Sequence, residues 1–285
     1  TNKIEKTLYF FPKPEAMIQK EITIKEDKLQ AILKYKKSKK VKMISINALQ
    51  ALGKTWDERE CKFNYNLSDL VQIGKDYVCT KEDIEGLELN LKDLESISFG
   101  GIDDRVGIKV NRNTDFAENL YYREEKIFKY MEIRNYIIKP FLYFLYYGIM
   151  PLEVHSAINL MVDEGLGGNR SIGVGTFLSN EFIKIDAPTI YSPNIYMNLS
   201  TYMPLKKETK ELIGYKLEKR DGYMYYKGGQ PYRKKSMNIV TEGALVSNKV
   251  EGNIANVTPI QMEDKISVYL YGKAFLMPLG GDEFE

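Results

Sequence analysis

The amino-acid sequence predicts an α+β protein made of two ferredoxin-like (RRM-like) domains in tandem. Runs of β-forming residues outnumber helix-like segments, and one amphipathic helix lies between strand-like runs. The resulting order of strand, strand, helix and strand corresponds to the end of a βαββαβ unit. A Pro-bearing stretch, residues 187–193, separates this series from a second one. We therefore expect an N-terminal domain with insertions and a long hairpin over residues 1–186, whose first strand and helix are absent from the chain, and a C-terminal domain over 187–285.

The beginning of the N-terminal domain gives the weaker pattern. Residues 22–24 and 41–46 are strand-like runs. The apolar spacings in residues 67–73 and 87–94 fit either a short helix or a strand, and both alternatives stay open.

A long hairpin and a central strand are expected next. Residues 105–110 and 120–131 are rich in β-formers and flank the polar turn 111–115, which predicts a hairpin. Residues 141–147 are apolar on both faces, a pattern typical of a central strand.

A helix follows, with Pro151 as its first-turn residue. Four apolar residues at i, i+4, i+7 and i+8 form one stripe that we expect to be buried: Val154, Ile158, Met161 and Val162. Gly165 ends the helix, and a glycine-rich loop then leads into a strand predicted at 176–185.

The C-terminal domain repeats the alternation of strand and helix signals. The expected elements are strands at 195–202, 215–218, 223–226, 237–245 and 268–276, and a short helix at 206–212.

Composition excludes several classes of function. One histidine, His155, and two cysteines, Cys61 and Cys79, without CxxC spacing cannot form the usual zinc site, so we expect neither metal nor cofactor. Two cysteines provide no disulfide framework, which fits a reducing cytoplasm. The longest apolar stretch, residues 141–150, is too short for a membrane span, so no membrane partner is expected.

Charge is distributed unevenly, although 41 basic and 39 acidic residues leave a net charge of only +2. Residues 25–42 hold eight lysines against two acidic residues, and residues 206–235 hold ten basic against four acidic residues. Residues 81–104 hold eight acidic residues against two lysines. Any one of these runs can be a solvated face, but such a bipolar surface suits a subunit with several partners.

The glycine-rich segment from Gly165 to Phe177 is the most informative stretch. Its five glycines allow backbone N–H groups to approach a phosphate closely, and Arg170 adds a charged fork. A Rossmann or P-loop site is excluded by the order of elements, because there the glycines precede a helix, whereas here they follow one. The alternative is a simple helix cap and turn with a solvent-facing arginine.

The helix, G-x-G-G-x-R-S-x-G-x-G-x-F loop and following strand resemble the glycine-rich loop of the RAMP superfamily of CRISPR proteins. The chain is similar in particular to the fourth Csm subunit of type III-A effector complexes. Further matching segments occur in the family's order: Tyr9–Pro14, Val110–Thr114 with Leu120-Tyr121, Asn198–Ser200, Arg220–Tyr223, Arg233–Lys235, Thr241–Gly243 and Tyr271–Phe275.

This resemblance implies a non-catalytic subunit that acts in antiviral defence. It would bind the 5′ handle of the CRISPR RNA (crRNA) and link the large polymerase/cyclase-like subunit to the backbone RAMP subunits. Phosphates and splayed bases of single-stranded RNA are held by backbone amides, basic side chains and aromatic rings. The expected RNA-binding residues are Gly165, Gly167, Gly168, Asn169, Arg170, Ser171, Gly173, Gly175, Arg112, Arg220, Arg233, Lys234 and Lys235.

Three alternatives were weighed against this function. The first is a RAMP endoribonuclease that processes CRISPR precursor RNA with His155 as general acid or base. The second is nucleotide cyclisation by the terminal Gly280–Phe284 segment, which we reject because only Glu285 follows it and no further strand could hold a metal and a nucleotide. The third is a two-domain binder of small molecules or lipids.

Overall fold

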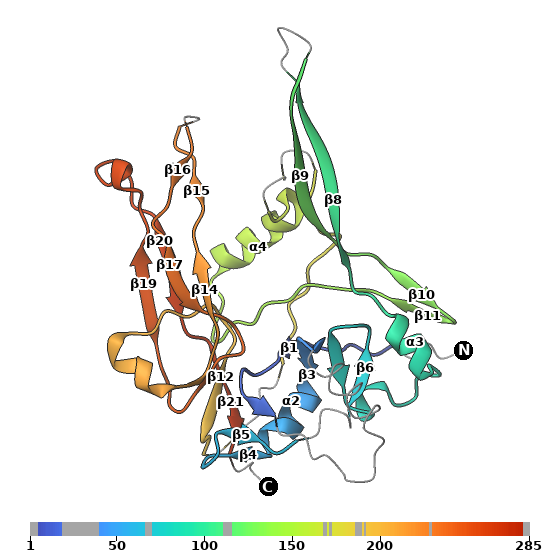
Figure 1. The fold of residues 1–285 in the computed structure, drawn as a ribbon. Coiled ribbons are helices and arrows are strands. Elements are labelled where there is room, and N and C mark those ends of the chain that lie inside the picture. Colours follow the sequence, from blue (N-terminus) through green and yellow to red (C-terminus); the bar gives the residue numbers. More distant parts are fainter. Residues whose placement is uncertain are drawn as a thin grey trace. The chain divides into compact units, whose positions relative to one another are not determined.

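The computed structural model of the chain describes residues 5–18, 40–65, 70–110, 116–167, 170, 173–185, 190, 192–227 and 230–281. It shows a mixed α+β architecture with many short strands and few helices, as the sequence predicts (Figure 1). The chain forms two compact units. Unit 1 comprises residues 1–98 and 188–285, and unit 2 comprises residues 99–187.

The first part of unit 1 is built from short strands and two α-helices. Its elements are β1 (Phe10–Pro12), β2 (Met17–Ile18), β3 (Met43–Ser45), α2 (Ile46–Gly53), β4 (Trp56–Asp57), β5 (Lys62–Phe63), β6 (Val71–Ile73), β7 (Tyr77–Cys79), the 3₁₀ helix η2 (Glu82–Ile84) and α3 (Leu91–Ser96). One sheet has the order β1-β3-β7-β6, in which β3 and β7 are parallel, and a second has the order β2-β5-β4. Residues 67–73 and 87–94, for which helix and strand both stayed open, therefore contain strand β6 and the start of helix α3. The expected strand 22–24 lies outside the described residues.

The second part of unit 1 contains the C-terminal sheet. Its elements are β12 (Ile195–Asn198), the 3₁₀ helix η4 (Lys206–Glu211), β13 (Leu212–Gly214), β14 (Leu217–Arg220), β15 (Tyr223–Met224), β16 (Tyr232–Arg233), β17 (Met237–Val240), β18 (Leu245–Val246), β19 (Gly252–Asn256), the 3₁₀ helix η5 (Ile260–Met262), β20 (Tyr269–Lys273) and β21 (Leu276–Gly280). The sheet is antiparallel with the order β13-β18-β12-β21. Tyr202, Val240 and Val246 belong to a fully buried apolar cluster beside it, so this sheet anchors the core.

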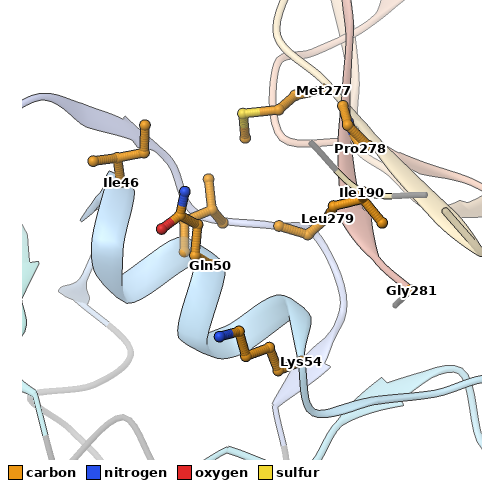
Figure 2. Close-up of a pocket in the computed structure, with 9 residues that line it drawn as sticks. Ile46, Gln50, Lys54, Ile190, Met277, Pro278, Leu279 and Gly281 are labelled. Atoms are coloured by element: carbon orange, nitrogen blue, oxygen red, sulfur yellow. The ribbon is translucent and has the colours of Figure 1, made fainter. Parts of the chain in front are cut away.

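Helix α2 joins the two parts of unit 1 by packing on β21. Gly53, the last residue of α2, lies so close to β21 that a Cβ atom there would be 1.8 Å from the carbonyl oxygen of Leu279. Beside this contact, Ile46 and Gln50 of α2 line a small groove together with Met277 and other β21 residues (Figure 2). A residue without a side chain is therefore required where helix and strand meet.

The segment Tyr9–Pro14 and the residue after it form a second connection. The backbone N–H of Glu15 donates to the carbonyl of Gly243 (2.8 Å), and Lys216 Nζ lies 2.5 Å from Glu15 Oε1. A Cβ on Gly214 would be 1.7 Å from the carbonyl oxygen of Glu15. This matching segment of the sequence thus has a structural role between the N-terminal and C-terminal sheets.

Unit 2 is dominated by the predicted hairpin. Its elements are β8 (Gly101–Val110), β9 (Ala117–Ile127), β10 (Met131–Ile133), β11 (Tyr136–Ile138) and α4 (Leu152–Glu164). Strands β8 and β9 are antiparallel from the Gly101–Ile127 pair to the Val110–Ala117 pair, which confirms the long hairpin (Figure 1). Helix α4 confirms the predicted helix, but none of its residues is buried.

Two predicted strands of the N-terminal domain are wrong. Residues 141–147 form no strand, and Tyr147 is 96% exposed. A central strand needs a neighbour on each side, but in unit 2 β8 pairs with β9 and β10 pairs with β11. The described residues of 176–185 form no strand either; they run back along α4, with the N–H of Phe177 donating to the carbonyl of Val162 (3.1 Å).

Candidate nucleic-acid interface

The glycine-rich segment forms a closed turn after α4. Gly165 ends the helix with φ 82°, and its N–H donates to the carbonyl of Met161 (2.9 Å). The turn closes where the N–H of Leu166 donates to the carbonyl of Gly175 (2.9 Å). A Cβ on Gly175 would lie 2.1 Å from the carbonyl oxygen of Leu166, and one on Gly165 would lie 2.9 Å from the carbonyl carbon of Gly175. These two glycines therefore form the neck of the turn.

Two other glycines of the turn have open space around them. Gly167 and Gly173 have φ values of 112° and 79°, and a Cβ built on either would meet nothing within 4 Å. The side chain of Arg170 lies between them in sequence, is 54% exposed and approaches Glu164 at 3.9 Å, too far for a strong ion pair. Gly167 and the guanidinium of Arg170 are thus exposed at the tip, whereas the N–H of Gly173 donates to the carbonyl of Arg170 (2.9 Å) and the neck glycines have a packing role.

The remaining predicted residues of this loop and of the hairpin turn lie outside the described residues. They are Gly168, Asn169, Ser171 and Arg112. Their assignment to RNA binding stays a prediction.

His155 lies on the side of α4 that faces the returning segment. Its ring stacks on Phe182 with centroids 4.2 Å apart, and its Nδ1 is 3.3 Å from Asn159 Nδ2. The side-chain oxygen of Asn159 accepts a hydrogen bond from Asn180. These contacts pack His155 against the segment that follows the turn, and its role as general acid or base stays a prediction. The apolar stripe predicted to be buried is half-buried at Ile158, Met161 and Val162 and exposed at Val154.

The other predicted basic residues lie in unit 1 on a projection that we call the tyrosine arm, residues 215–227 and 230–238. It consists of β14 and β15 along one side and of β16 and the first two residues of β17 along the other (Figure 1). None of its described residues is buried, and all four residues of β14 are exposed. The arm therefore stands away from the core.

Several basic side chains of the arm have carboxylate neighbours at the surface. Arg233 donates to Asp221 (2.9 Å), and this hydrogen bond with its accompanying charge raises the pKa of the guanidinium. Lys235 donates to Glu263 (2.6 Å), and Arg220 Nε lies 3.5 Å from Glu218. Such exposed ion pairs are weak and can be exchanged for a phosphate.

The structure thus brings the predicted residues together in two groups, one in each unit. The turn in unit 2 holds Gly165, Gly167, Arg170, Gly173 and Gly175. The arm in unit 1 holds Arg220, Arg233, Lys234 and Lys235.

The exposed tyrosines of the arm are not among the binding residues predicted from the sequence. Tyr223 and Tyr225 are 61% and 74% exposed. The signal that could have found them is a Tyr-x-Tyr repeat, Tyr223-Met224-Tyr225, between basic residues.

Metal, thiol and membrane sites receive no support from the described part of the chain. Within it, no three or more His, Cys, Asp or Glu side chains form a group that could hold a metal ion. Cys61 and Cys79 are both free, and burial raises the pKa of the Cys79 thiol to about 12. No helix in these ranges is long and apolar enough to cross a membrane. The terminal residues 282–285 lie outside the described residues.

Comparison with known proteins first defines the class. Residues 192–279 match the family model of the CRISPR Csm4 C-terminal domain. These residues include most of the C-terminal sheet and the tyrosine arm, so the match lies within unit 1.

Two individual proteins extend the similarity beyond that domain. The CRISPR system Cms protein Csm4 of Methanocaldococcus jannaschii is 29% identical over 211 residues, which cover 66% of this chain and 50% of the relative. The chain thus spans about half the length of this curated relative. The crystal structure of the Csm3-Csm4 subcomplex in the type III-A CRISPR-Cas interference complex has a similar fold, with a TM-score of 0.57 and 23% identity over 96% of this chain and 80% of that one. The resemblance to the fourth Csm subunit is confirmed.

Proposed function

We propose that the chain is a non-catalytic subunit of a type III-A interference complex and binds the 5′ handle of the crRNA. The observation that carries this proposal is the turn after α4, whose neck is closed by the Leu166–Gly175 hydrogen bond while Gly167 and the side chain of Arg170 stay exposed. Backbone amides near positive-φ glycines together with an arginine fork suit phosphate oxygens of single-stranded RNA.

The proposed partners are a backbone RAMP subunit and the large polymerase/cyclase-like subunit. The similar solved structure is a Csm3-Csm4 subcomplex, which supports a Csm3-like backbone partner for this chain. The acidic run at 81–104 and the basic arm provide surfaces of opposite charge for more than one neighbour. We place this assembly in the cytoplasm, where crRNA and the other subunits would be available.

We also propose that residues 187–285 are a ferredoxin-like domain and residues 1–186 its N-terminal counterpart. The C-terminal sheet has the order β13-β18-β12-β21; its strands, numbered as they occur along the chain, therefore follow one another as second, third, first and fourth, which is the arrangement that a βαββαβ unit adopts. For residues 1–186 the segments 141–147 and 176–185 form no strands, so a ferredoxin-like domain there would have to be built from the other strands of this range. A solved structure of the assembled complex in which those other strands form no βαββαβ sheet would limit the ferredoxin-like fold to the C-terminal domain.

Substitution of Arg170 tests the handle-binding proposal. We expect Arg170→Glu to weaken binding of a handle RNA at least about tenfold, because a charge-assisted hydrogen bond to phosphate is replaced by repulsion. Fluorescence anisotropy with the full chain measures this effect.

The matched control is Lys92→Glu, which makes the same change of charge at an exposed position of α3. Both variants should give wild-type circular dichroism. Equal handle affinity in Arg170→Glu and the wild type would refute the proposal, as would equal losses in both variants.

A further inference from the structure

The tyrosine arm combines positive charge with aromatic side chains at high density. Within residues 215–235 there are seven basic residues against two acidic ones, an excess of five positive charges. The same 21 residues contain five tyrosines: Tyr215, Tyr223, Tyr225, Tyr226 and Tyr232. Basic side chains interleaved with aromatic rings are typical of surfaces that bind single-stranded nucleic acid.

The backbone of the arm sorts these side chains onto two faces. Exposure alternates along residues 222–227, with Tyr223 and Tyr225 exposed and Met224 and Tyr226 half-buried. Tyr223 lies directly across from Arg233 in the β15–β16 pair, so both side chains are on the exposed face. Tyr225 directly follows β15, and residues two apart in an extended backbone are about 7 Å apart, which leaves room for one base on each tyrosine ring.

We propose that this exposed face, formed by Tyr223, Tyr225 and Arg233, is a stacking platform for the bases of single-stranded RNA. The two rings hold neighbouring bases irrespective of sequence, and Arg233 exchanges Asp221 for a phosphate. The inference rests on the proposed function, because the guide RNA of the complex supplies the ligand. The glycine-rich turn would contact phosphates, whereas this face would contact the bases.

The composition of the arm around this face favours RNA over a protein partner. Protein interfaces are enriched in tyrosine and arginine but depleted in lysine. The arm carries five lysines in residues 215–235, and each of them would lose hydration in a protein interface. A polyanion with exposed bases satisfies both the excess charge and the rings.

The test uses the full chain and an unstructured RNA of about twelve nucleotides unrelated to the handle, within the usual site size of such surfaces. The double variant Tyr223→Ala/Tyr225→Ala, which removes two stacking rings, should bind this RNA at least about thirtyfold more weakly than the wild type. An abasic RNA of the same length, which keeps the phosphates, should bind both proteins equally. Tyr223→Phe/Tyr225→Phe should restore binding, since stacking requires the ring and not the hydroxyl.

The control variant is Tyr147→Ala, which removes an exposed tyrosine from a segment, residues 140–169, without lysine or arginine. Unchanged affinity of the alanine double variant, or equal losses with base-bearing and abasic RNA, would overturn the inference while leaving handle binding intact. Wild-type protein that does not bind this RNA but binds the handle through Arg170 would also overturn the inference and leave handle binding intact. If the alanine double variant weakens binding of this RNA while Arg170→Glu leaves handle affinity unchanged, only the proposed function is refuted. If the alanine double variant no longer bound a purified backbone subunit while its RNA affinity was unchanged, the arm would be a protein interface.

Discussion

At the scale of single residues, Glu208 shows how one buried carboxylate organises the C-terminal part of unit 1. Its Oε2 accepts hydrogen bonds from the Tyr202 hydroxyl (2.9 Å) and from the N–H groups of Leu205 (2.9 Å) and Gly252 (3.2 Å), and its Oε1 accepts from the N–H of Glu251 (2.9 Å). Burial alone would raise the pKa of Glu208, but these four hydrogen bonds together lower it. Burial and the bond to Glu208 raise the pKa of Tyr202.

We predict that Glu208→Gln lowers the free energy of unfolding by about 2–3 kcal/mol at pH 7, because the amide cannot accept all the bonds that the carboxylate accepts. The pKa of Glu208 is lower in the folded than in the unfolded chain, so its stabilisation is present above about pH 4.3 and is lost as the pH falls through the folded pKa. Urea unfolding between about pH 3 and 7 measures both effects.

Glu85→Gln is the control for this prediction, since Glu85 is exposed. The difference in unfolding free energy between the wild type and Glu208→Gln should shrink on acidification. A difference that stays constant with pH would show that the carboxylate charge has no role.

At the scale of elements, the glycines of the glycine-rich turn have two different roles, packing and the proposed phosphate binding, although the sequence motif suggested a single binding role. Gly165 and Gly175 allow the backbone to close at the neck, whereas Gly167 and Gly173 leave the tip accessible. Glycines in one loop can therefore serve packing or binding.

Substitutions at these positions should have different effects. Alanine at position 175 or 167 incurs the energetic cost of a positive φ, but only Gly175→Ala also places a Cβ 2.1 Å from the carbonyl oxygen of Leu166. We expect Gly175→Ala to reduce protection of the Leu166 amide in hydrogen exchange at least about tenfold, since it disrupts the neck hydrogen bond. Gly167→Ala should leave this protection nearly unchanged, and similar losses in both variants would contradict the assignment.

The sequence predicts those elements whose signals are local. The hairpin of β8 and β9 follows from β-formers around a polar turn, and α4 follows from its apolar period. The strands expected at 141–147 and 176–185 depend on neighbours that the local pattern does not specify, and the structure does not provide them.

The candidate site was predictable to a similar degree. Charge runs and glycine spacing indicate the turn and the basic arm directly. The stacking face is different, because Tyr223 and Tyr225 resemble core residues until the structure shows that the arm stands away from the core.

At the scale of the whole molecule, unit 1 is assembled from segments near both ends of the described chain. Helix α2 packs on β21, and Glu15 contacts Gly214, Lys216 and Gly243. The C-terminal domain that the family model recognises is therefore part of a larger unit.

Gly53→Ala tests the connection between α2 and β21. Helix propensity alone would favour alanine by up to about 1 kcal/mol, but the added Cβ would overlap the carbonyl of Leu279. We expect a net destabilisation of about 1–3 kcal/mol in urea unfolding. Gly101→Ala, where a Cβ meets nothing within 4 Å, should have little effect, and a stabilised Gly53→Ala would contradict the close packing.

The contact between Lys216 and Glu15 also has a consequence in time. These residues are 201 positions apart, and contacts of long sequence separation slow folding. At ribosomal rates of about 5–20 residues per second, Glu15 would wait roughly 10 to 40 seconds for its partner to be synthesised. Until then, the backbone groups around Glu15 must form hydrogen bonds with water or with a chaperone, because the residues that they contact in unit 1 have not yet been synthesised.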